Sequence, residues 1–175
     1  MPLVIDASVG GASANSFLTL AEAQTYMDAR LNGSLWDAAD TDDQNRALVE
    51  ATRELSHFCW CGTRVTTTQS LAWPRQWVVN PDTPAFAWAY YDTTVIPQRV
   101  KDATAELAFQ FLNAGTSDLA SADPNAGVVE KTIDVLTTRW AAFQRPSGWA
   151  RFPRVLGYVG PLLEESSGGI DVVRG

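Results

Sequence analysis

The stretch IPQRVKDATAELAFQFLNAG, Ile96 to Gly115, decides the fold of this chain. Apolar residues recur along it at helical spacing, so one face of the expected helix carries an apolar stripe. That stripe consists of Val100, Ala103, Leu107, Phe111 and Leu112. Pro97 suits the first turn of a helix, and the sequence Asn113-Ala114-Gly115 suits its end. The stretch therefore predicts a long amphipathic helix that buries one face.

Two more helices are predicted nearer the N-terminus. SFLTLAEAQTYMDARL, residues 16–31, contains Thr19 followed by Glu22, the pattern of a capping box, and predicts a helix over residues 20–30. A second apolar periodicity predicts a helix over residues 42–59, with Thr41 and Gln44 as its capping box. Residues 31–41 between them are expected to form a loop.

The region between the second and third helices, residues 63–96, has a non-helical pattern and many aromatic residues. It includes QSLAWPRQW, residues 69–77, in which Pro74 favours extended geometry at Trp73. We expect Trp73 to anchor this loop, so that Trp73→Ala opens a cavity, and Pro74 to fix its direction. Arg75 is expected to pair with a carboxylate, either in the same subunit or in a neighbouring one, so that Arg75→Ala impairs assembly and leaves the monomer folded.

The remaining segments complete a mainly α-helical single domain, residues 1–175. The helical core covers about 16–115, a polar linker about 116–127, and a C-terminal arm about 128–175. In that arm, the β-branched residues of 128–143 predict strand, and a short helix begins at Pro153. Residues 1–15 are expected to form an extended arm or an edge strand. The fold class is thus a small helical bundle with an extended aromatic loop insertion and a β-containing C-terminal arm.

The charge of the chain is negative and uneven. The formal net charge is −7, and residues 1–60 carry nine acidic residues against three arginines. Such a chain repels nucleic acid at long range unless it gathers its basic residues locally. The sequence also shows neither a signal peptide nor an apolar run of about 18 residues, so no membrane segment is predicted.

Candidate chemical sites are weak. His57, Cys59 and Cys61 lie within five residues of each other, without the second pair of ligands that a zinc site needs. The adjacent carboxylates at residues 40–43 suit a helix start better than a hydrolytic site. We therefore expect no catalytic residue, no metal, no cofactor and no enzymatic activity.

One segment, residues 139–154, combines basic and aromatic residues and contains no acidic residue. Its candidate interface residues are Arg139, Trp140, Arg145, Trp149, Arg151 and Arg154. Single-strand binding proteins use such combinations, and so do protein interfaces. On a chain with a net charge of −7, the protein interface is the favoured interpretation. In the tail, Ile170, Val172 and Val173 are candidates for docking by strand addition.

Several motifs occur in an order that resembles a family of small tailed-phage proteins. They are ANSFLTLAEAQTYMDAR, ALVEATREL, CGTR, QSLAWPR and IPQRVKDATAELAFQFL, between Ala14 and Phe111. Phe17 stands where the family usually has Tyr, and Met27 where it usually has Phe. Some members are described as DnaT-like single-stranded-DNA-binding proteins and others as head–tail connector proteins.

The resemblance, weighed with the acidic composition, favours a structural head–tail adaptor in the neck of a phage virion, made in the host cytoplasm. The implied partners are further copies of the chain in a ring, twelvefold by resemblance, the portal protein, and a tail-side stopper or tail terminator protein. DNA would pass through the ring without sequence-specific binding, and no membrane is involved. The alternative is a single-stranded-DNA-binding protein of phage replication.

Overall fold

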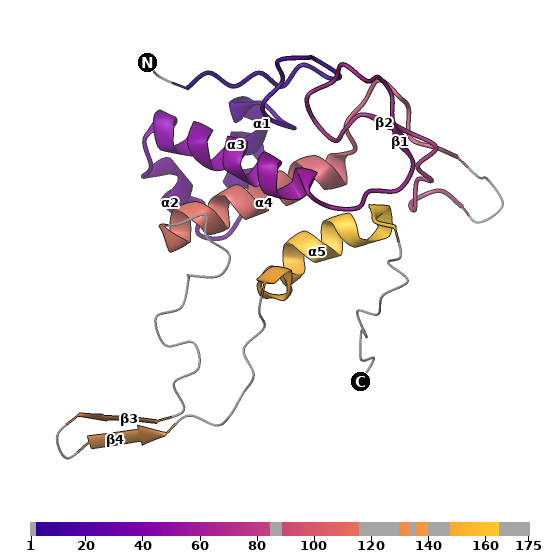
Figure 1. Cartoon of the computed structure of the whole chain (residues 1–175). Helices are drawn as coiled ribbons and strands as arrows, with labels where there is room; N and C mark the ends of the chain where they lie inside the picture. Colours follow the sequence, from indigo (N-terminus) through magenta and orange to yellow (C-terminus); the bar gives the residue numbers. More distant parts are fainter. Residues whose placement is uncertain (1–2, 85–88, 116–129, 134–135, 140–147, 165–175) are drawn as a thin grey trace.

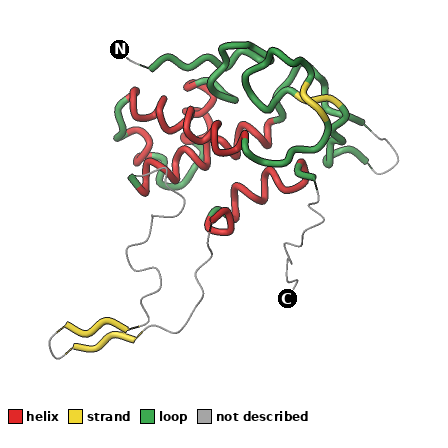
Figure 2. Tube along the Cα trace, in the orientation of Figure 1, coloured by secondary structure: helices red, strands yellow, loops and turns green. Residues whose placement is uncertain are grey.

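The computed structural model describes residues 3–84, 89–115, 130–133, 136–139 and 148–164, and this part of the chain is mainly helical, as predicted (Figure 1). Figure 2 shows the helices gathered together, with irregular chain between α3 and α4. In chain order the elements are α1 (Leu20–Asp28), α2 (Ser34–Asp37), α3 (Thr41–Ser56), β1 (Thr63–Arg64), β2 (Arg75–Gln76), α4 (Gln98–Ala114), β3 (Glu130–Ile133), β4 (Leu136–Arg139), η1 (Gly148–Arg151), α5 (Pro153–Val159) and η2 (Gly160–Leu162).

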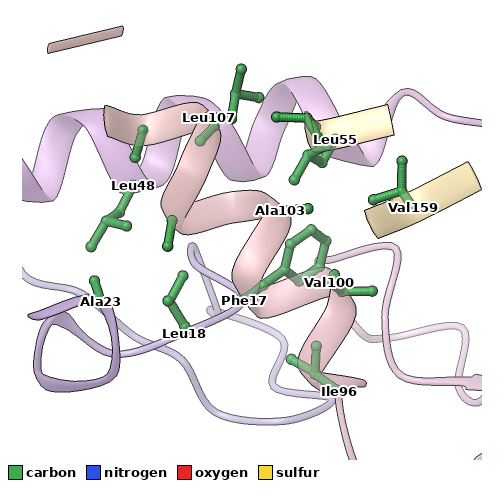
Figure 3. Close-up of a cluster of buried hydrophobic side chains, with 14 of the residues drawn as sticks. Phe17, Leu18, Ala23, Leu48, Leu55, Ile96, Val100, Ala103, Leu107 and Val159 are labelled. Atoms are coloured by element: carbon green, nitrogen blue, oxygen red, sulfur yellow. The ribbon is translucent and has the colours of Figure 1, made fainter. Parts of the chain in front are cut away.

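Helix α4 is the centre of the core and contacts α1, α2, α3 and α5. Its predicted stripe is buried at Val100, Ala103 and Leu107, which have no exposed surface. Figure 3 shows the side chains that surround this face: Phe17, Leu18, Ala23, Leu48, Leu55, Ile96 and Val159. The helix ends as predicted, because Gly115 adopts a left-handed conformation (φ 67°).

Helix α1 begins as predicted. The Thr19 side chain accepts a hydrogen bond from the Glu22 backbone, and the Glu22 carboxylate accepts one from the Thr19 backbone. The helix ends at Asp28, two residues before the predicted end, which leaves Arg30 outside it. The predicted loop that follows contains α2, whose Trp36 is fully buried. A helix of four residues is too short to show a periodic pattern in the sequence.

Helix α3 begins one residue earlier than predicted, and its N-cap is Asp40. The predicted capping box of Thr41 and Gln44 is wrong. The Asp40 carboxylate accepts a hydrogen bond from the backbone N of Asp43 (2.8 Å), and Gln44 donates to the backbone oxygen of Trp36 (2.9 Å). The predicted C-terminus at residue 59 was three residues too long, since the helix ends at Ser56.

The described part of the N-terminal segment folds back onto α3, whereas an extended arm or an edge strand was expected. Asn45 of α3 donates a hydrogen bond to the backbone oxygen of Leu3 (2.8 Å). Asn15 donates to the backbone oxygen of Val4 (2.9 Å), and its amide oxygen accepts from the backbone of Asp6 (2.8 Å). These bonds close the segment into a loop on the core.

The C-terminal segment contains the predicted strand and helix. Strands β3 and β4 pair antiparallel, with Glu130 opposite Arg139. Helix α5 begins at Pro153, and the chain turns into η2 at Gly160. Val155 and Val159 of α5 are fully buried, so this helix completes the core. No helix in the described ranges has both the length and the apolar character needed to cross a bilayer.

Candidate nucleic-acid interface

The QSLAWPRQW loop is interior structure. Trp73 is 1% exposed and packs edge to face on Trp60, with ring centroids 5.6 Å apart. Pro74 is buried, and the Trp73–Pro74 peptide bond is cis. Gln69 is also buried, and its amide donates to the backbone oxygens of Leu71 and Pro74. Trp73 and Pro74, both predicted interface residues, are therefore enclosed by the chain itself.

Among the described residues, Arg75 forms no ion pair with a carboxylate, and its pairing with a neighbouring subunit stays a prediction. Its guanidinium donates to four backbone carbonyls, at distances between 2.5 and 3.3 Å. The acceptors are the oxygens of Trp60, Cys61, Gly62 and Ala72. Burial, followed by the nearby charge of Arg64, lowers the pKa of Arg75 from its ordinary value. Arg75 thus ties β2 to the chain that follows α3.

Some of the other predicted site residues lie in the described part of the chain, and the rest lie outside it. Trp149 packs on Phe58, with ring centroids 4.5 Å apart. Arg151 is the last residue of η1, and Arg154 lies in the first turn of α5. Arg139 lies at the end of β4. The remaining candidates, Trp140, Arg145, Ile170, Val172 and Val173, lie outside the described residues. In the described ranges, His57, Cys59 and Cys61 are part of no group that could hold a metal ion.

Arg154 belongs to a polar cluster that α1, α4 and α5 build around Glu106. Arg30 binds this carboxylate with two hydrogen bonds of 2.8 Å, and its guanidinium lies 3.7 Å from the ring centre of Phe109. The Tyr26 hydroxyl donates to Glu106 (3.1 Å), and Arg154 lies 3.5 Å from the same oxygen. Because α1 ends before Arg30, this side chain can cross to α4.

The cluster lies in a cleft. One hollow of about 540 Å³ is bordered by Tyr26, Arg30, Arg154 and Tyr158. A second, of about 210 Å³, adjoins it at Arg30 and Arg154 and adds Arg151 and Phe152. We call this surface the arginine–tyrosine cleft and define it by Tyr26, Arg30, Arg151, Arg154 and Tyr158.

The cleft is positive although the chain is acidic. Among the described residues, Glu106 is the one acidic side chain that lines either hollow. Three arginines against one carboxylate give 3 − 1, a formal charge of +2. Arg30 is 13% exposed and fully engaged with Glu106, whereas Arg154 is 60% exposed. Arg154 is therefore the guanidinium best placed to leave Glu106 for an external anion.

Glu106 stays ionised over the physiological range. Burial raises its pKa, but the hydrogen bonds from Arg30 and Gln110 and the charges of Arg30 and Arg154 outweigh burial and hold the pKa at about 2. Burial chiefly, with the hydrogen bond to Tyr158, raises the pKa of Tyr26 well above its usual value. Tyr26 thus remains a neutral hydroxyl that donates to the carboxylate. The cluster is a preformed, charged and fully hydrogen-bonded site.

A larger hollow, of about 640 Å³, lies between Leu3, α3 and the end of α4. Its charged rim is self-compensating, because Arg46 pairs with Asp43 (2.6 Å) and Arg53 pairs with Glu50 (3.1 Å). These pairs are neutral, so this hollow offers no attraction to a polyanion.

Sequence reasoning identified Arg151 and Arg154 but missed Tyr26, Arg30 and Glu106. One signal was present, since Glu106 stands beside the apolar stripe of the central helix. A carboxylate buried there requires a cation from another element. The sequence pattern does not indicate which cation it is, because Arg30 lies 76 positions away.

A family model described as "Putative DnaT-like ssDNA binding protein" matches residues 1–175. No curated protein and no solved structure matches the chain. The family match covers all three helices that build the arginine–tyrosine cleft.

Proposed function

The chain belongs to the family of DnaT-like ssDNA binding proteins, and from this premise we propose that it binds single-stranded DNA. The surface that we assign to this binding is the arginine–tyrosine cleft. Single-strand binding combines guanidinium groups that contact phosphates with aromatic rings that stack on bases. The cleft supplies both kinds of group from α1 and α5.

The expectation of a head–tail adaptor is wrong. The family that covers the whole chain is described by single-stranded DNA binding, which agrees with the alternative function and not with the adaptor. The error came from weighing the net charge of the entire chain. The acidic residues lie largely elsewhere, and the charge of the cleft has the opposite sign.

The expectations that accompanied the adaptor were a homo-oligomeric ring, portal and tail-side partners, and a place in the virion neck. These stay predictions, as does the expectation of no enzymatic activity.

The observation that carries the proposal is the environment of Arg154. Arg154 is exposed and lies next to the Glu106 carboxylate, whose charge Arg30 already neutralises. Loss of its contact with Glu106 leaves no buried charge unpaired, so Arg154 can move to a phosphate at small cost. One turn further along α5, Tyr158 lies on the same helix face and borders the same hollow.

The test is a titration of labelled oligothymidylate at several salt concentrations with the wild type, Arg154→Gln and Arg46→Gln. Arg46 is a matched control, since it is 62% exposed and paired with carboxylates on α3. We expect Arg154→Gln to weaken binding roughly three- to tenfold and to reduce the slope of log K against log salt by about 0.7, the contribution of one phosphate contact. Arg46→Gln should bind like the wild type.

Two results would count against the proposal. A wild-type protein that binds no oligothymidylate at low salt would refute the function. Equal effects of Arg154→Gln and Arg46→Gln would refute the assignment of the cleft.

A further inference from the structure

Trp77 has an unusual backbone and an exposed side chain. Its φ is +66°, in the left-handed region, and its side chain is 67% exposed. A bulky residue in this conformation is strained by about 1–2 kcal/mol, and exposure of an indole ring to water is also unfavourable. Neither feature stabilises the fold, so together they suggest a function for Trp77.

The left-handed turn determines where the ring points. In regular strand geometry Trp77 would lie on the same face as Arg75, which points into the protein. The turn at Trp77 reverses the alternation, so Val78 is buried (1% exposed) and Trp77 faces water. Gly62 makes the arrangement possible, because a Cβ atom there would lie 2.2 Å from the backbone oxygen of Gln76.

Two further side chains extend the exposed surface around Trp77. Val79 is 39% and Tyr90 is 52% exposed, and their backbones form a β-bridge. The rings of Trp77 and Tyr90 meet edge to face, with centroids 5.8 Å apart. Backbone hydrogen bonds from Tyr91 to Val78 (3.0 Å) and from Asn80 to Ala89 (2.9 Å) hold the two segments together. Trp77, Val79 and Tyr90 therefore form a preformed aromatic platform.

Near the platform, Arg64 can contact a phosphate, and the two nearby carboxylates already accept hydrogen bonds from other side chains. Arg64, on β1 opposite Arg75, is exposed and has no hydrogen-bond or ion-pair partner among the described residues. The Asp82 carboxylate is engaged by Arg99 (2.5 Å), and that of Asp92 accepts hydrogen bonds within its own turn from Thr94. Arg64 is in register with Arg75, which precedes Trp77 by two residues. A guanidinium and open aromatic rings together are the groups that bind a phosphate and an adjacent base.

The size of the platform favours a base over a protein. A stable protein interface buries about 800 Å² on each partner, whereas the apolar part of this platform consists of three side chains. A nucleobase needs one open aromatic face. Polar side chains border the rings, since Thr63 and Gln76 form a hydrogen bond next to Trp77.

We propose that Trp77 and Tyr90 form a stacking site for an unpaired nucleobase, with Arg64 contacting a neighbouring phosphate. The inference rests on the proposed function and adds a second contact on the same strand. The arginine–tyrosine cleft would bind the strand mainly through its phosphates, and the aromatic platform would bind it by stacking on a base.

The experiment compares oligothymidylate with an abasic deoxyribose-phosphate strand of equal length, by competition against a labelled oligothymidylate. We expect the wild type to prefer the strand with bases. Trp77→Ala and Tyr90→Ala should weaken that preference, by about fivefold or more for Trp77→Ala, and Trp77→Phe should retain most of it. The thermal unfolding midpoint of each variant checks that it is folded. If one of the two alanine variants does not fold, the other still tests the stacking site.

The outcomes separate the two proposals. Equal wild-type binding of both strands, or a base preference that is undiminished in Trp77→Ala, would overturn the stacking site and leave the proposed function intact. A wild type that binds neither strand would overturn both. If Trp77→Ala changes only self-association in sedimentation, the platform is a protein contact and the inference is wrong.

Discussion

Arg75 is the residue at which the structure changes the sequence interpretation most. A guanidinium in a family motif next to tryptophan looked like an interface group. Its guanidinium instead donates four hydrogen bonds to backbone carbonyls of a loop that has no regular secondary structure to satisfy them. A sequence motif of this kind can therefore record a structural requirement.

Arg75→Ala should destabilise the monomer by about 2–3 kcal/mol, because several partly buried carbonyls lose their donor. This replaces the expectation that the monomer would be unaffected. The measurement is the free energy of unfolding in urea. Arg64→Ala, an exposed neighbour across the hairpin, is the control and should change stability by less than about 0.5 kcal/mol. Similar values for the two variants would contradict the structural role.

Glu106 makes the free energy of unfolding depend on pH in the acidic range. Its pKa is about 2 in the folded protein against 4.5 for the ordinary group, so the folded state favours the carboxylate. The stabilisation, about 3 kcal/mol, is complete above pH about 4.5 and is lost as the pH falls towards about 2.

We expect Glu106→Gln to be clearly less stable than the wild type at pH 7, because it leaves Arg30 without its carboxylate. The difference between them should shrink as the pH falls from about 4.5 to about 2. Urea unfolding at pH 7 and pH 3 measures it. Glu50→Gln, in an exposed pair with Arg53, should follow the wild type at both values. A constant difference for Glu106→Gln would show that its charge is not what stabilises the fold.

At the scale of elements, the long helices were predictable, as were the start of α1 and the end of α4, whereas the end of α1 and both ends of α3 were not. Helix α4 has enough turns for its apolar stripe to be unambiguous. At the start of α3 the sequence pattern predicted Thr41 as the cap, whereas the structure has the adjacent Asp40, a residue type that caps equally well. The αL turn at Trp77 was not predictable either, since it requires the close approach that Gly62 allows.

The two candidates for the α3 cap can be separated by mutation. Asp40→Ala should destabilise the protein by about 1 kcal/mol, because it removes the acceptor for the backbone N of Asp43. Thr41→Ala should have an effect below about 0.5 kcal/mol. Thermal or urea unfolding of the two variants is sufficient. A larger loss for Thr41→Ala would restore the capping box that the sequence suggested.

At the scale of the whole molecule, distribution of charge matters more than its sum. The mainly helical class followed from periodicity, and the DnaT-like part of the family resemblance followed from ordered motifs, whereas the head–tail connector part has no support. The cleft did not, because Tyr26, Arg30, Glu106 and Arg154 come from three helices that only the fold brings together. Even so, Arg154 was among the sequence candidates, because a basic and aromatic segment stands out in an acidic chain.

The most direct test of the central claim is the map of backbone amide shifts in ¹⁵N-labelled protein titrated with oligothymidylate. The account predicts perturbations at the end of α1, at Arg30, and from Arg151 at the end of η1 to Tyr158 in α5, with little change on the exposed face of α3 around Arg46. Perturbations confined to α3, or none at low salt, would contradict the claim that this cleft binds single-stranded DNA.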